Sequence, residues 1–127
     1  MSDTALWLEV LGQIEEAISR IERRFVGIQS ADDLTSSDEG LDKLDGIAMM
    51  LIWMGEGIKN LEKYGGKALL EAHPEVDWKG AKGTRDILSH HYGNVDAEVV
   101  FNICANRIPT VKAAIQLIKD DLEDGNI

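Results

Sequence analysis

The sequence predicts an all-α protein that folds as an up-and-down bundle of four to five helices. Three observations support this prediction. Apolar residues recur every three or four positions along most of the chain, capping residues with glycine or proline divide these stretches, and no stretch shows the sustained alternation typical of strands. Helices with short connections pack best as a bundle in which each apolar stripe faces a neighbour.

The first helix is expected over residues 5–25. Its apolar residues have the spacing of a helix with one buried face, and they are Leu6, Val10, Ile14, Ile18, Ile21 and Phe25. The polar, turn-prone stretch 29–38 ends this pattern. The helix is therefore long enough to cover a whole side of the bundle.

The second helix is predicted to begin at Ser36, because Ser36 and Glu39 have the spacing of a capping box. An apolar stripe continues over residues 41–61. Gly65 and Gly66 follow it, and glycine tolerates the positive φ that ends many helices.

A third helix is predicted from residue 78 to about residue 92. One or two helical turns over residues 67–73 should precede it and stop before Pro74, since the residue before a proline avoids the α region. Asp77 can cap the start of the third helix, and Gly93 is positioned to terminate it.

Asp96 is the expected cap of a fourth helix. That helix carries the apolar residues Val99, Val100, Ile103, Cys104 and Ile108. Pro109 either kinks it or opens a fifth helix, which carries Val111, Ala114, Ile115, Ile118 and Leu122. The acidic tail after Lys119 is expected to be a solvated, frayed helix end.

Length and composition predict one domain over residues 1–127, with 44% hydrophobic residues and only two prolines. The single cysteine, Cys104, cannot form an intramolecular disulfide, which favours a reducing cytoplasm. No signal peptide is visible, and the apolar run 46–55 has about half the ~20 residues that a transmembrane helix needs. No membrane association is expected.

The net charge of −10 counts against a general nucleic-acid binder, because the chain repels polyanions at long range. The distribution of charge is uneven. Residues 1–64 have a net charge of −7, whereas residues 79–92 have a net charge of +2. A local basic region therefore exists near the start of the third predicted helix.

Most standard site signatures are missing from the sequence. Residues 80–84 contain Gly-x-Lys-Gly-Thr, but the lysine precedes the second glycine and no strand comes before it, unlike a phosphate loop. The three histidines and Cys104 lack zinc-ligand spacing, and the acidic residues 120–124 lack the spacing of a calcium loop. Ser89 and Cys104 have no base suitably placed to activate them as nucleophiles. We expect no metal and no cofactor.

The remaining candidate is the string RDILSHHY, in which Arg85 is followed by His90 and Tyr92. It resembles the signature of the HEPN superfamily, and the tyrosine is similar to that of the HepT-like family in particular. Asp86 fills the polar position, where that family often has asparagine. Trp78 and the helix start NVDAEVVF also resemble the family, so the likeness extends over most of the chain.

This resemblance implies an endoribonuclease toxin of a type VII HEPN/MNT toxin–antitoxin pair, dimeric and restrained by a nucleotidyltransferase antitoxin that transfers AMP to Tyr92. RNA cleavage without metal needs a proton acceptor and a cation for the charge on phosphorus. His90 can act as general base or acid, and Arg85 can bind phosphate through its planar fork. Tyr92 would hydrogen-bond to the RNA or stack on it.

The predicted helix cannot by itself gather these three residues. At 100° per residue, Arg85 and Tyr92 share a face, but His90 points about 140° away from Arg85. Either the helix loosens before Gly93, or a second subunit supplies part of the site. The resemblance favours a cleft between two copies of the chain.

Three neighbouring residues are assigned supporting roles in the site: Lys82, Asp86 and His91. His91 lies on another face from His90, so it is a surface or interface residue or an assistant in the chemistry. The apolar side chains Met49, Met50, Trp53 and Met54 are expected in the core or in the dimer contact.

Two other functions remain open from the sequence. Arginine and histidine near a helix C-terminus interact favourably with the helix dipole, and tyrosine often lies half-buried there, so a purely structural bundle is possible. A non-catalytic subunit that binds a nucleotide, or presents a substrate to a nucleotidyltransferase, is the alternative from a different class. Only the ribonuclease requires His90 for RNA scission.

Overall fold

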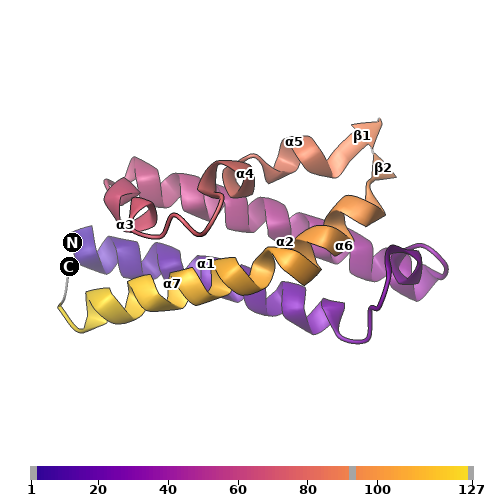
Figure 1. Ribbon diagram of the computed structural model, residues 1–127, viewed down its shortest axis with the longest axis horizontal. Helices are drawn as coiled ribbons and strands as arrows, with labels where there is room; N and C mark the ends of the chain where they lie inside the picture. The colour runs from indigo at the N-terminus through magenta and orange to yellow at the C-terminus, as the bar shows by residue number, and fades with distance from the viewer. Residues whose placement is uncertain (1–2, 92–93, 126–127) are drawn as a thin grey trace.

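The computed structural model describes residues 3–91 and 94–125. The chain runs along the bundle four times in alternating directions (Figure 1). The first two passes are single helices, α1 (Asp3–Phe25) and α2 (Asp38–Lys63), joined through the 3-10 helix η1 (Ala31–Leu34). The third and fourth passes are divided into shorter helices: α3 (Lys67–Glu71), α4 (Trp78–Lys82) and α5 (Thr84–Leu88), then α6 (Ala97–Asn106) and α7 (Ile108–Glu123).

The predicted all-α, up-and-down bundle is confirmed, with one local addition. Two short strands, β1 (Ser89–His91) and β2 (Asn94–Val95), pair antiparallel between α5 and α6 at one end of the bundle (Figure 1). The sequence gives no alternation long enough to predict strands of three and two residues.

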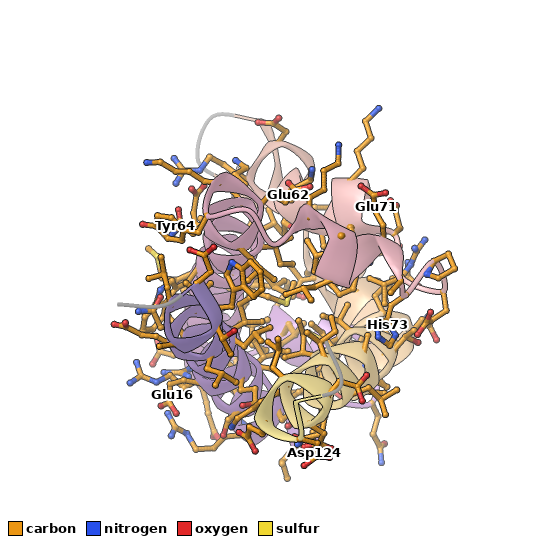
Figure 2. The ribbon with its side chains drawn as sticks, turned by 90° about the vertical axis from the view of Figure 1, so that its left-hand side faces the viewer. Glu16, Glu62, Tyr64, Glu71, His73 and Asp124 are labelled. Atoms are coloured by element: carbon orange, nitrogen blue, oxygen red, sulfur yellow. The ribbon has the colours of Figure 1, made fainter. Side chains whose placement is uncertain are left out.

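The core lies between the apolar faces of α1, α2 and the α6–α7 pass. Viewed along the bundle, the labelled Glu16, Glu71 and Asp124 lie at the periphery, while the apolar side chains lie between the helices (Figure 2). The largest fully buried side chains are Leu11, Ile14, Ile18, Ile21, Leu34, Ile47, Leu51, Met54, Ile58, Leu61, Leu70 and Ile115. The stripe predicted for α1 is buried along its middle, at Val10, Ile14, Ile18 and Ile21, and its two end residues, Leu6 and Phe25, are half-buried.

The start of α2 differs from the prediction by one residue. Ser37, and not Ser36, is the N-cap, and its hydroxyl accepts a hydrogen bond from the Gly40 amide at 3.0 Å. The Ser36 amide instead donates to the Asp32 carbonyl at 2.9 Å, so Ser36 still belongs to the turn that ends η1.

The predicted third helix over residues 78–92 is wrong in its continuity and in its end. It divides at Gly83, and the second part stops at Leu88. The reason for the stop is a competing hydrogen bond: the Leu88 carbonyl accepts from the Asp96 amide at 2.9 Å. This bond ties the end of α5 to the start of α6 and leaves residues 89–91 to form β1.

Four other expected boundaries are confirmed. The Asp77 side chain accepts from the Gly80 amide at 2.9 Å, and Asp96 accepts from two amides in the first turn of α6. Pro109 lies in the first turn of α7, so it opens a new helix after α6 and does not kink a continuous one. Gly65 has φ +89° just after α2. Within the described residues, no helix has the length and apolar character needed to cross a membrane.

Candidate active site

The residues 78–95, which we call the motif segment, contain α4, α5, β1 and β2 and carry Arg85 and His90. Gly55 of α2 determines how closely this segment approaches the bundle. A Cβ atom at position 55 would lie 2.7 Å from the Ala81 carbonyl oxygen, which is closer than van der Waals contact allows. Only glycine therefore lets the end of α4 rest on α2.

An ion pair between Lys82 and Glu62 also links α4 to α2. The Lys82 ammonium lies 2.7 Å from a carboxylate oxygen of Glu62, about two turns further along α2 than Gly55. Both side chains are mostly buried, with 28% and 21% of their surface exposed. The ammonium of Lys82 is thus bound within the chain, and its supporting role in RNA chemistry stays a prediction.

Thr84 is the first residue of α5 and immediately precedes Arg85. Its side chain is buried, with 3% exposed, and its hydroxyl donates to the Ala81 carbonyl at 2.6 Å. The Asp86 amide donates to the Gly83 carbonyl at 3.0 Å, which starts the new helical turn. These two bonds fix the backbone on either side of Arg85.

Arg85 is exposed, and none of the described carboxylates forms an ion pair with it. Arginine stays charged at any physiological pH and binds phosphate in bidentate fashion. Asp86 is also exposed. The structure therefore presents the guanidinium of Arg85 to solvent on a backbone that Thr84 anchors.

His90 lies in β1, beyond the end of the helix. Ser89 pairs with Val95 and His91 pairs with Asn94, so β1 has one more residue than β2 between these pairs, and that residue is His90. Such an extra residue is a β-bulge, which redirects a side chain and often lies beside an active site. The helix therefore ends before Gly93. This was one of the two alternatives that the sequence left open for gathering the site residues.

Several predicted site groups lie outside the part of the structure that is described. These are the side chains of His90 and His91 and the whole of Tyr92 and Gly93. The backbone arrangement of Arg85, His90 and His91 is shown, whereas the distances between their functional groups are not. The roles of His90, His91 and Tyr92 stay predictions.

The buried cysteine does not resemble a nucleophile. Burial raises the pKa of the Cys104 thiol to about 12, so the thiol remains protonated at neutral pH. In the described part of the chain, no group of three histidine, cysteine or acidic side chains could hold a metal ion.

Sequence reasoning missed Gly55, Glu62 and Thr84, which position the motif segment. A signal for Gly55 was present, because two glycines in the middle of a long helix, Gly55 and Gly57, cost stability unless close packing requires them. A Cβ atom at Gly57 would lie 2.7 Å from the Ile14 side chain, so both glycines serve close contacts. Nothing in the sequence indicated Glu62.

Comparison with known protein sequences shows the family of this chain. The sequence pattern of the family described as "Ribonuclease HepT-like" matches residues 14–118, which include all of α2 and the motif segment. The chain belongs to the HepT-like family of the HEPN superfamily. The description of the family is that of a ribonuclease.

Three relatives each carry the name "Putative RNase". One from Methanocaldococcus jannaschii is 36% identical over 75 residues, which are 58% of this chain and 59% of the relative. A second from that organism is 32% identical over 71 residues, 56% of this chain and 58% of the relative. One from Caldanaerobacter subterraneus subsp. tengcongensis is 32% identical over 65 residues, 51% and 54% respectively. The match spans under two thirds of the length of each of these relatives, and no solved structure matches the chain significantly.

Proposed function

We propose that this HepT-like chain is a metal-independent endoribonuclease, the toxin of a type VII HEPN/MNT toxin–antitoxin pair in the cytoplasm. The observation that supports it best is the backbone at the motif. An exposed Arg85 without a described carboxylate partner lies in α5, and the chain leaves the helix two residues before a bulged His90. The family's description and the names of the relatives agree with RNA as the substrate.

In the proposed reaction, the ribose 2′-oxygen attacks the adjacent phosphorus and displaces the 5′-oxygen of the next nucleotide. One His90 accepts the 2′-hydroxyl proton, and a protonated histidine, His90 of a second copy in the proposed dimer, donates a proton to the leaving oxygen. Arg85 binds the phosphate oxygens as negative charge accumulates in the transition state. The products are a 2′,3′-cyclic phosphate and a 5′-hydroxyl end.

The proposed dimer would bring two motif segments to one cleft. Apolar side chains that the bundle leaves exposed support a contact between copies: Met49 and Trp53 are 59% and 38% exposed on α2, whereas Met54 is buried. Met50 is partly buried against the core. A mass measurement in solution at micromolar concentration should give twice the chain mass, and a monomer would contradict this part of the proposal.

RNA cleavage by the purified chain tests the function directly. In buffer with EDTA, the wild type should cleave single-stranded RNA and leave cyclic phosphate ends. Arg85→Ala and His90→Ala should each lower the rate by roughly 10²–10⁴-fold, because each removes a group acting in the transition state. Arg23→Ala removes an exposed cation from α1 and should cleave normally.

Cleavage that survives His90→Ala would remove the mechanism. A wild-type protein that binds nucleotides but cuts no RNA would instead identify the chain as the non-catalytic subunit. Circular dichroism of each variant should show unchanged helix content, since Arg85 is exposed and has no described ion-pair partner.

The cognate nucleotidyltransferase antitoxin is proposed to inactivate the chain by transferring AMP to Tyr92. Each AMP would bring a phosphate close to Arg85 in sequence, and the phosphate would compete with RNA for that cation. The intact mass after co-expression with the neighbouring gene should rise by one or more AMP units, mapped to Tyr92. Tyr92→Phe should escape modification and stay active, and a Tyr92→Phe protein silenced equally well would make partner binding the inhibitory step.

A further inference from the structure

A cleft of about 430 Å³ lies between the motif segment and the junction of α6 with α7. Its floor is formed by buried apolar side chains, namely Met54, Val76, Ile108 and Val111. Its polar rim includes Asn102, Asn106, Arg107 and Thr110. A volume of this size with apolar walls and a few polar groups is typical of a small-molecule site.

The cleft adjoins the candidate active site along the chain. Thr84 lines the cleft, and Arg85 is the next residue. A phosphate bound by Arg85 would therefore place the neighbouring nucleotide within reach of the cleft.

Two amides on the rim offer the hydrogen-bonding groups that a nucleobase needs. Asn106 donates from its side-chain nitrogen to the Asn102 oxygen at 2.6 Å, across one turn of α6. This bond leaves the Asn102 amide nitrogen as a donor and the Asn106 oxygen as an acceptor. Asparagine side chains read base edges with such a donor and acceptor.

Charges of both signs surround the cleft, although the whole chain is acidic. Arg107 lines the cleft, and Lys79 and Arg85 directly neighbour lining residues; none of these cations forms an ion pair with a described carboxylate. Two carboxylates also line the cleft: the Glu75 carboxylate lies 3.1 Å from His73, and the Asp77 carboxylate caps α4.

We propose that this cleft binds one unpaired base of the RNA, beside the phosphate that Arg85 holds. The inference rests on the proposed function for the identity of the polymer, and it adds the specificity of cleavage. Bases of single-stranded RNA can be splayed out and held by apolar walls and by hydrogen bonds to their edges. The amide pair of Asn102 and Asn106 would then select which base is accepted.

Binding of the four ribonucleosides, with ribose 5-phosphate as the phosphate-only probe, tests the proposal without any cleavage. Thr110→Trp should block the cleft, since Thr110 lies on its rim, while Ala113→Trp adds the same bulk one turn later on an exposed face of α7 outside the cleft. Asn106→Ala should break the amide pair. Its matched control is Gln116→Ala, which breaks the exposed Gln116–Asp120 hydrogen bond on α7.

The expected result is that one nucleoside binds more tightly than the others. Thr110→Trp and Asn106→Ala should weaken it by about tenfold or more, whereas both controls should leave it unchanged. Ribose 5-phosphate should not displace it. In RNA cleavage, Asn106→Ala should flatten the base preference, while Arg85→Ala should abolish cleavage and keep nucleoside binding.

Four outcomes would overturn the proposal. Three concern nucleoside binding: no nucleoside binds, ribose 5-phosphate displaces the nucleoside, or the control variants weaken its binding equally. The proposal would also be overturned if Thr110→Trp blocked binding of the nucleotidyltransferase but left nucleoside binding and base preference intact. The cleft would then be a protein-binding site. Failure of the proposed function can be told apart from failure of this inference. A chain that binds a nucleoside in the cleft but never cleaves RNA would contradict only the proposed ribonuclease activity.

Discussion

The helical frame and the motif segment of this protein are built by different means. The frame consists of α1, α2 and α7, which have 23, 26 and 16 residues. Each contributes a continuous buried stripe to one core. Burial of many apolar side chains at ~25 cal/mol per Å² gives such a frame a stability that no single contact dominates.

The motif segment has no helix longer than five residues, and its strands have three and two. Isolated helices of fewer than ~12 residues are marginal in water. The segment is instead held by a few individual contacts: the close approach at Gly55, the hydrogen bond from Thr84, and the Lys82–Glu62 ion pair.

This difference implies that stability and site geometry can be changed separately. Truncating a large apolar side chain in the frame should lower the free energy of unfolding and leave the cleavage rate of the folded protein nearly unchanged. Disturbing a contact under the motif segment should in addition lower the cleavage rate of the folded protein, because misplacing a catalytic group by about 1 Å can cost roughly 10²-fold in rate.

The largest effect is expected for Leu51→Ala in the frame. Leu51 has no exposed surface, so its truncation should leave a cavity and lower the free energy of unfolding by about 2–5 kcal/mol. Urea denaturation gives this value, and RNA cleavage at low temperature should give a rate per folded molecule near that of the wild type. A rate that falls in parallel with stability would show that the two regions are coupled.

An intermediate effect is expected for Gly55→Ala, which adds one methyl group beneath the motif segment. The new Cβ would lie 2.7 Å from the Ala81 carbonyl oxygen, and backbone cannot yield without moving α4. We expect a loss of about 1–3 kcal/mol in stability and a drop of roughly ten- to a hundredfold in RNA cleavage.

Gly12→Ala is the matched control for that substitution. Gly12 lies within α1, and a Cβ there would meet no atom within 4 Å. It should raise the free energy of unfolding by about 0.5–1 kcal/mol, since alanine is the better helix former, and leave cleavage unchanged. Equal losses of activity in both variants would contradict a specific role for Gly55.

The same division explains how much could be predicted from the sequence. Helices α1 and α2 were predicted because each has a stripe of many apolar residues, so that no single residue decides the prediction. The caps at Asp77 and Asp96 were predicted because each caps the helix that begins directly after it. The Arg85 and His90 motif was found by its resemblance to the HEPN signature, and the family match agrees with it.

The geometry of the motif segment could not be predicted, because it depends on contacts between residues far apart in the chain. The Leu88 carbonyl ends α5 by bonding to Asp96, and Lys82 pairs with Glu62, twenty positions earlier. Asp77 as the expected cap and Gly93 as the expected terminator extended the third helix to about residue 92, and neither residue carried information about these two partners.

The smallest effect, and the sharpest test of the comparison, concerns the Lys82–Glu62 ion pair. If Lys82 positions the motif segment, then Lys82→Met and Glu62→Gln should each lower RNA cleavage by a few-fold, and the double variant should be no worse. If Lys82 instead contacts RNA, Glu62→Gln should free it and strengthen RNA binding, whereas Lys82→Met should weaken it. We expect the first pattern, because the 2.7 Å pair is mostly buried against α2.

A double-mutant cycle on stability supplies the second measurement. The coupling energy of Lys82 with Glu62 should be about 1 kcal/mol, larger than the ~0.3–0.5 kcal/mol of an exposed helix pair. Lys59 and Glu56 are the control, at 3.4 Å and about half exposed. Equal coupling in both pairs would mean that the ion pair does not hold the motif segment, and the close approach at Gly55 and the Thr84 hydrogen bond would then have to position Arg85 alone.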